Sequence, residues 1–156
     1  MVIPIAHRIN TIEDSNSIPR NIGIEFDVHA YGSELVVSHD PFCNGVKLKN
    51  FLKHNKDRFC AINIKEEGIE KDVINLSLSL GLNSFFLFDV NLPQIYKLGD
   101  KYRNFLCLRI SEYESIATAL NLKGMVQWAW IDCFTKFPLE PEEAESLQKW
   151  GIKLCF

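Results

Sequence analysis

The strongest constraint on the fold is a repeating order in which an apolar, strand-like run is followed by a helical segment. Helical patterns occur at Ile69–Leu80 and Pro141–Trp150, and a Ser-x-x-Glu pattern at Ser111–Glu114 predicts the start of a helix that runs to Leu120. Strand-like runs are expected at 2–6 (as a buried strand), 22–28, 59–65, 84–90, 105–108, 125–131 and 152–156. Apolar strands alternating with helices are typical of parallel sheets. The order predicts an α/β fold, specifically a (β/α) TIM-barrel-like fold with about seven parallel strands.

The length of 156 residues predicts a single barrel-like domain over residues 1–156. Complete eight-stranded barrels typically need about 250 residues, so the barrel is expected to be short or incomplete at its C-terminus. An open parallel edge exposes unpaired backbone groups, which favours association with another chain. We therefore expect either a homodimer that covers this edge or a less regular closure.

Composition excludes several classes of function. The net charge of −3 gives no basic footprint for nucleic acid, and no apolar run reaches the length of a membrane span. The five cysteines show no CxxC or CxH spacing, which argues against a disulfide framework or a zinc site. We expect a cytoplasmic protein that acts on a small molecule.

Polar residues recur where the apolar strand runs end, at His7-Arg8, Glu25 and Asp27, Lys65, Asp89, Arg109 and Asp132. In (β/α) barrels and doubly wound sheets the active site lies at the carboxyl ends of the strands. Glu25 and Asp27 are two residues apart on a predicted strand, so their carboxylates should share one face. The pattern predicts one site built from these strand ends.

A further β-rich run, 35–38, ends in His39-Asp40 and brings a histidine toward the two carboxylates. Carboxylates and a nearby histidine are typical of metal-assisted acid/base chemistry. A structural ion cluster of Glu25 and Asp27 with basic side chains is the alternative. His29 and His54 lie outside these motifs and are expected at the surface.

The ordered motifs resemble those of the glycerophosphodiester phosphodiesterase family, which belongs to the phospholipase-C-like phosphodiesterase barrels. The resemblance covers about the first 65 residues and rests on four motifs: His7-Arg8, Glu25-Phe26-Asp27, His39-Asp40 and Asn63-Ile64-Lys65. It implies a phosphoric diester hydrolase on a TIM barrel. Asn10-Thr11 corresponds only loosely to the family's Pro-Glu-Asn-Thr segment.

The resemblance also implies roles for six side chains. His7 and His39 would be the acid/base pair, and Arg8 and Lys65 would bind the phosphate. Glu25 and Asp27 would bind the metal ion. Carboxylate oxygens favour Mg²⁺ or Ca²⁺ over softer metals. Additional candidates at the predicted site are Asn63, Asp40, Asp89, Arg109 and Asp132.

Two departures from the family pattern leave alternatives open. Asn63 stands where the family has a glutamate that binds metal, which removes one negative charge from the site. No large insertion follows His39-Asp40, where some members carry a small extra domain that recognises glycerol. The alternative to an active enzyme is an inactive relative that binds a phosphorylated ligand or a partner chain. A third hypothesis is a sugar-phosphate lyase or isomerase on a similar barrel.

Overall fold

The structure is a computed structural model that describes residues 2–156, and its contacts divide the chain into two compact units, Met1–Leu87 and Phe88–Phe156. Both units are mixed α/β, as predicted. Parallel pairing is confirmed for β1 with β2, β2 with β5, β7 with β8, and β8 with β9. The expectation of a single domain stays a prediction.

The N-terminal unit contains a mixed sheet in the order β4-β3-β2-β5-β6, with β1 paired to β2. The β2–β3 and β3–β4 pairs are antiparallel, so the run at 35–38 forms a hairpin with β2. The elements are β1 (Ile5–Ala6), α1 (Ile12–Ser17), β2 (Gly23–Tyr31), β3 (Glu34–Val37), β4 (Val46–Lys47), α2 (Leu48–Asn55), β5 (Cys60–Ile64), α3 (Glu70–Ser79) and β6 (Phe85–Phe88).

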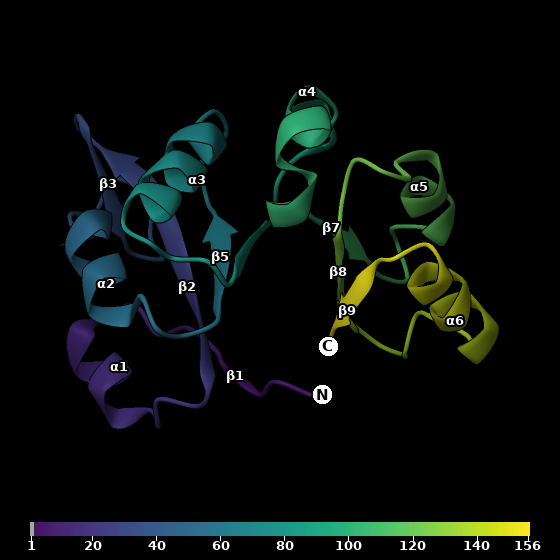
Figure 1. Ribbon diagram of the computed structural model, residues 1–156, viewed down its shortest axis with the longest axis horizontal. Helices are drawn as coiled ribbons and strands as arrows, with labels where there is room; N and C mark the ends of the chain where they lie inside the picture. The colour runs from purple at the N-terminus through teal and green to yellow at the C-terminus, as the bar shows by residue number, and fades with distance from the viewer. Residues whose placement is uncertain (1) are drawn as a thin grey trace. The chain divides into compact units, whose positions relative to one another are not determined.

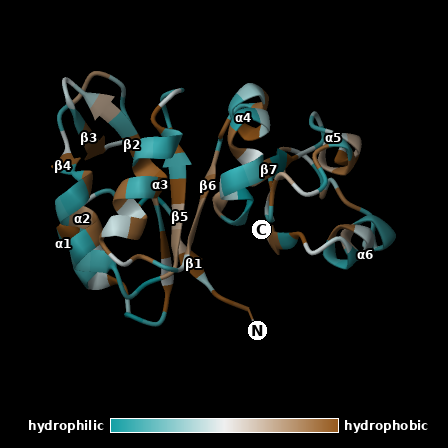
Figure 2. Ribbon diagram, turned by 45° about the horizontal axis from the view of Figure 1, so that its top comes forward, coloured by the Kyte–Doolittle hydropathy of each residue, from teal (hydrophilic) through white to brown (hydrophobic). Residues whose placement is uncertain are grey.

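Helices α1, α2 and α3 lie on one side of this sheet (Figure 1). Ile24, Phe26 and Val28 of β2 are completely buried, and the Phe26 ring lies 4.7 Å from that of Phe51 on α2. Hydrophobic colour is concentrated in the strands and hydrophilic colour on outer helix turns (Figure 2). The opposite face of β2 is therefore left for its polar side chains.

A buried guanidinium holds the segment that follows α1. Arg58 is only 2% exposed and donates hydrogen bonds to the carbonyl oxygens of Ser15, Ile18, Pro19 and Ile22 at 2.5–3.0 Å. These carbonyls lie at the helix end and in the loop beyond it, where backbone acceptors lack helical partners. Arg58 thereby fixes the loop that leads into β2.

The C-terminal unit contains a parallel sheet in the order β7-β8-β9, with α5 and α6 on one side of it (Figure 1). Phe88, the last residue of β6 and the first of this unit, stacks on the half-buried Trp130 with ring centroids 4.4 Å apart. The elements are α4 (Leu92–Tyr102), the 3₁₀ helix η1 (Arg103–Phe105), β7 (Cys107–Ile110), α5 (Ile116–Asn121), β8 (Trp128–Ile131), α6 (Pro141–Lys149) and β9 (Lys153–Cys155).

The sequence predicts an incomplete barrel, and the strands do not close into a full one. Each of the seven strand-like runs overlaps a strand, but across residues 2–156 the strands form two sheets that no strand pairing joins. The fold is thus a mixed α/β fold with parallel strands. No helix in the same stretch is long and apolar enough to cross a membrane.

Two local predictions are wrong. The first strand, predicted over 2–6 as buried, is limited to Ile5–Ala6, which is half-buried and makes only two register pairs with β2. Residues 2–4 are exposed, with Val2 at 92%. The predicted helix start at Ser111 is instead a tight turn, in which Ser111 and Glu114 exchange two backbone hydrogen bonds and one between side chains. Helix α5 begins only at Ile116, after Ser115 as its N-cap.

Replacing Arg58 by methionine should destabilise the fold, because four carbonyl acceptors at and beyond the end of α1 lose their charged donor. We expect a loss of about 3 kcal/mol in the free energy of unfolding, measured by urea denaturation. The matched control is Arg20→Met, since Arg20 is exposed and donates to a single carbonyl, that of His54. An equal loss in the two variants would contradict the role assigned to Arg58.

Candidate functional site

The in-register pairing of β2 with β5 places three polar side chains together. Glu25 and Asp27 share one face of β2, and Asn63 lies opposite Asp27 on β5. Both carboxylate residues are buried, at 0% and 1% exposure, and Asn63 is 6% exposed. Burying two carboxylates side by side requires hydrogen bonds or counter-charges, because isolated buried charges are strongly unfavourable.

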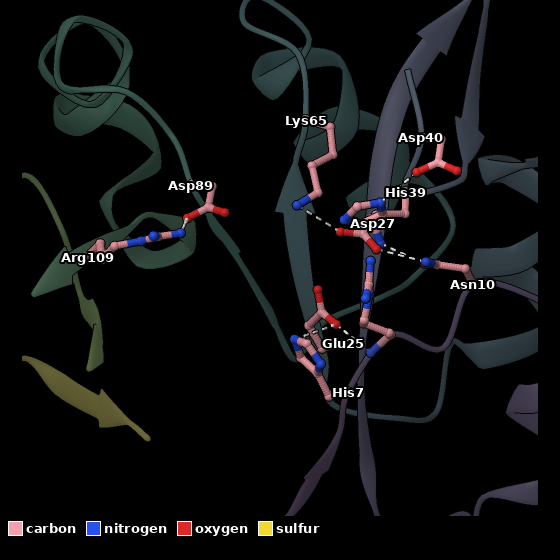
Figure 3. A network of polar contacts seen from close by, with 10 residues as sticks. His7, Asn10, Glu25, Asp27, His39, Asp40, Lys65, Asp89 and Arg109 are labelled. Atoms are coloured by element: carbon pink, nitrogen blue, oxygen red, sulfur yellow. Dashed lines mark hydrogen bonds and ion pairs between the residues drawn. The ribbon is translucent and has the colours of Figure 1, made fainter. Parts of the chain in front are cut away.

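The carboxylate of Asp27 is held by two different donors. Asn10 donates through Nδ2 to Oδ2 at 2.7 Å, and the Lys65 ammonium lies 3.1 Å from Oδ1 (Figure 3). The side-chain oxygen of Asn10 also accepts the backbone N–H of Asp27 at 2.9 Å. Asn10 and Lys65 therefore fix the orientation of the Asp27 carboxylate. Asn10, which the sequence connected only loosely to a family motif, is part of the site.

Glu25 is held by the segment that follows β1. Its Oε2 accepts the backbone N–H of Arg8 at 2.6 Å and lies 3.6 Å from His7 Nε2 (Figure 3). Arg8 has a positive φ of 59°, a conformation uncommon outside glycine, and here it aims the backbone N–H at the carboxylate. Burial raises the pKa of Glu25 above its ordinary value, an effect that the Arg8 N–H opposes and the nearby Asp27 charge reinforces.

The β2–β3 hairpin delivers His39 and Asp40 to the same end of the sheet. The backbone N–H of Ser38 donates to the Asp27 carbonyl at 3.1 Å, so His39 follows directly after a contact with β2. His39 Nδ1 lies 2.9 Å from Asp40 Oδ1 (Figure 3). The hydrogen bond and charge of His39 lower the pKa of Asp40, and the Arg8 guanidinium adds to this effect. His39, Asp40 and Arg8 thus act on one another electrostatically.

The loop that carries His39 depends on a close backbone approach at Gly45. A Cβ atom at this position would collide with the carbonyl oxygen of Val37. Only glycine lets the chain turn here from β3 into β4, and this turn closes the loop that holds the histidine.

The oxygen atoms near Glu25 are of the kind that a hard divalent cation prefers, but there are fewer charged ligands than such an ion usually has. Glu25 Oε1 and Asn63 Oδ1 are buried oxygens with no hydrogen-bond partner in the described part of the chain. Unpartnered buried oxygens on one sheet face suit Mg²⁺ or Ca²⁺. However, residues 2–156 contain no group of three or more histidine, cysteine or acidic side chains placed to hold a metal ion.

The expectation that His29 lies at the surface is wrong, because it is buried at 3% exposure. Glu25, Asp27 and His29 are spaced two residues apart along β2, and this spacing places all three side chains on one face of the strand. The same spacing is visible in the sequence and could have predicted the position of His29. His29 Nδ1 lies 2.9 Å from the Ala30 carbonyl oxygen, while Nε2 has no partner within residues 2–156.

The three remaining candidates form a separate ion cluster in the C-terminal unit. The Arg109 guanidinium bonds Asp89 through Nη2 and lies 3.3 Å from Asp132 through Nη1. Burial lowers the pKa of Arg109, but the two carboxylates more than offset this effect and raise it overall. Asp89 and Arg109 line a cavity of about 620 Å³, together with Asn91, Tyr113, Glu114 and Thr118 among others.

Stability should depend on pH through Glu25. Because the folded state raises the pKa of Glu25, the folded protein holds this proton more tightly than the unfolded chain does. The contribution of Glu25 to stability is therefore complete below its ordinary pKa of 4.5 and is lost as the pH rises through the raised value. The Glu25→Gln variant should gain stability relative to the parent protein over this window.

The measurement is urea denaturation of both proteins between about pH 4 and pH 8. Glu13→Gln, at an exposed position, is the control. Repeating the comparison in proteins that also carry His7→Gln removes the contact between His7 and Glu25 and isolates the effect of Glu25. A stability difference that does not change with pH would contradict the burial effect.

Comparisons with known proteins show the fold and not the family. No family model matches the sequence, and no curated protein matches it. The structure is similar to that of a glycerophosphodiester phosphodiesterase from Agrobacterium tumefaciens str. C58, with a TM-score of 0.69 and 16% sequence identity. The similarity covers 99% of this chain and 85% of that one. At this identity the likeness establishes that the chain shares the fold of a phosphodiesterase of this kind.

Proposed function

We propose that the protein hydrolyses a phosphodiester at the cluster formed by β1, β2, β5 and the β2–β3 hairpin. One observation supports this most directly: two histidine–carboxylate pairs, His7 with Glu25 and His39 with Asp40, lie at the same strand ends as basic side chains. The likeness to a solved phosphodiesterase fold agrees with it. Paired acid/base groups and cations are what phosphodiester cleavage requires.

In the proposed reaction, a water oxygen attacks phosphorus and the bond to one ester oxygen breaks, which yields a phosphate monoester and an alcohol. With Nδ1 donating to Asp40, His39 presents the lone pair of Nε2 and serves as the base that takes the proton from water. His7 Nε2 lies 3.6 Å from Glu25 Oε2, on the segment that follows β1. It serves as the acid that protonates the leaving oxygen.

Arg8 and Lys65 are the proposed ligands of the phosphate oxygens. The Arg8 side chain is exposed and close enough to affect the pKa of Asp40. Lys65 is anchored on Asp27 by one contact, and an ammonium group has three donors, so others remain for a phosphate oxygen. Two cations can balance the charge that accumulates on phosphorus-bound oxygens.

A divalent cation, Mg²⁺ or Ca²⁺, would be held by Glu25, Asp27 and Asn63. Such an ion supplies charge neutralisation for the phosphate oxygens. The chain's contribution is a set of hard oxygen donors, two of which lack a hydrogen-bond partner in the described residues. Asn63 gives one negative charge fewer than the glutamate that the resemblance implies, so the ion should be held weakly.

A second candidate function is that of an inactive relative that binds a phosphorylated ligand or a partner chain. The observation that favours it is the ion pair between Lys65 and Asp27, which neutralises a proposed metal ligand internally. The expected homodimer and the cytoplasmic location stay predictions.

Replacing either His7 or His39 by alanine should reduce hydrolysis of an aryl phosphodiester by about 10²-fold or more, because each variant lacks one half of the acid/base pair. The measurement is kcat on purified protein, followed by release of the aryl alcohol. His54→Ala is the matched control, since His54 bonds Asn16 and Arg20 away from the cluster. Unchanged kcat in both His7→Ala and His39→Ala would contradict the assignment.

Replacing Asn63 by glutamate should strengthen divalent-cation binding, because it adds a carboxylate next to Asp27. Isothermal titration calorimetry with Mg²⁺ and Ca²⁺ measures this directly and does not depend on activity. Asn75→Glu adds the same charge on α3 and serves as the control. If neither the parent protein nor Asn63→Glu binds a divalent cation, the metal-dependent mechanism fails and the inactive relative is favoured.

A further inference from the structure

The C-terminal unit contains an anion site that one of its own side chains occupies. In the loop after β8, the backbone N–H groups of Phe134, Thr135 and Lys136 donate to Glu112 Oε1 at 3.1, 2.5 and 2.7 Å. The Thr135 hydroxyl lies 3.0 Å from the same oxygen. Successive N–H groups that converge on one point form a nest, a backbone arrangement that binds anions. We call residues 134–136 the amide nest.

The amide nest selects for negative charge. The N–H groups of Lys136, Thr135 and Phe134 hold the pKa of Glu112 well below its ordinary value. Oε1 accepts from the N–H groups of Thr135 and Lys136 and from the Thr135 hydroxyl, and it shares the Phe134 N–H with Oε2, which lies at the same 3.1 Å. The donors crowd on one oxygen, which has only two lone pairs. A group with several charged oxygens uses such donors better than one carboxylate oxygen does. Phosphate meets this description.

The position of the amide nest also favours a ligand. It follows the carboxyl end of β8, the edge at which parallel α/β sheets bind their ligands. Phe134 lies against Tyr113, with ring centroids 5.9 Å apart, and Tyr113 lines the cavity of about 620 Å³. Phe134, Thr135 and Lys136 are all exposed, so solutes reach the loop. Rotation of the Glu112 side chain would free the donors without disturbing any strand.

We infer that the amide nest is a binding site for a phosphate group, inorganic phosphate or a phosphate monoester, and that Glu112 is its displaceable internal occupant. Ligand binding then competes with Glu112, which lowers the apparent affinity of the intact protein. This inference concerns the C-terminal unit and does not depend on the proposed hydrolysis.

The test is a titration of the full chain with inorganic phosphate, followed by the ¹⁵N–¹H amide resonances of Phe134, Thr135 and Lys136. Glu112→Ala should show saturable shifts of these three amides, with half-saturation at a phosphate concentration about tenfold lower, or more, than in the parent protein. Glu112→Gln keeps the shape and removes the charge, and it serves as the second variant if Glu112→Ala folds poorly. Sodium chloride at equal ionic strength gives the baseline.

The control variant is Glu114→Ala, which removes one negative charge from the same segment and leaves the nest occupied. Its phosphate titration should match that of the parent protein. Equal shifts in Glu114→Ala and Glu112→Ala would show that general charge is responsible and would overturn the inference. Absence of phosphate-specific shifts in both Glu112 variants would overturn the site. If the parent protein shows no amide shift even at high phosphate concentration, the claim that phosphate displaces Glu112 is wrong.

Discussion

The in-register pairing of β2 with β5 is the constraint on which the candidate site depends. Strand alternation sends Ile24 and Phe26 into the core with α2 and leaves Glu25 and Asp27 on the other face. A slip of one residue would exchange the two faces and place the carboxylates against the apolar core with α2. The strong packing of the apolar face therefore also fixes the polar one, and it places Asn63 next to Asp27.

Local sequence patterns predicted most of what local physics controls. The apolar runs located the strands, and the two-residue spacing of Glu25 and Asp27 located the shared face. The predicted strand ends at residue 28, so His29 is expected at the surface, whereas the same two-residue spacing places it on the shared face. Whether strands close into a barrel depends on pairing between strands far apart in the sequence, so local patterns do not predict it.

Contacts over long sequence separations explain the remaining differences. The guanidinium of Arg58 reaches back about 40 residues to carbonyls beyond α1, and nothing in its local sequence indicates this. The Ser-x-x-Glu pattern at Ser111–Glu114 forms a closed turn, and Glu112 between them is drawn to amides some 22–24 residues away. In each case a polar side chain forms hydrogen bonds with backbone groups that lie outside helices and strands. A periodic sequence pattern does not predict such contacts.

Asn10 gives the site a property that its charges alone would not provide. One amide both donates to the Asp27 carboxylate and accepts the Asp27 backbone N–H, so strand position and carboxylate orientation are coupled rigidly. The carboxylate is preorganised: its rotamer is selected before any ligand arrives, and little conformational entropy remains to be lost on binding. The same rigidity limits which ligands fit, because an ion or phosphate must accept the geometry that Asn10 imposes.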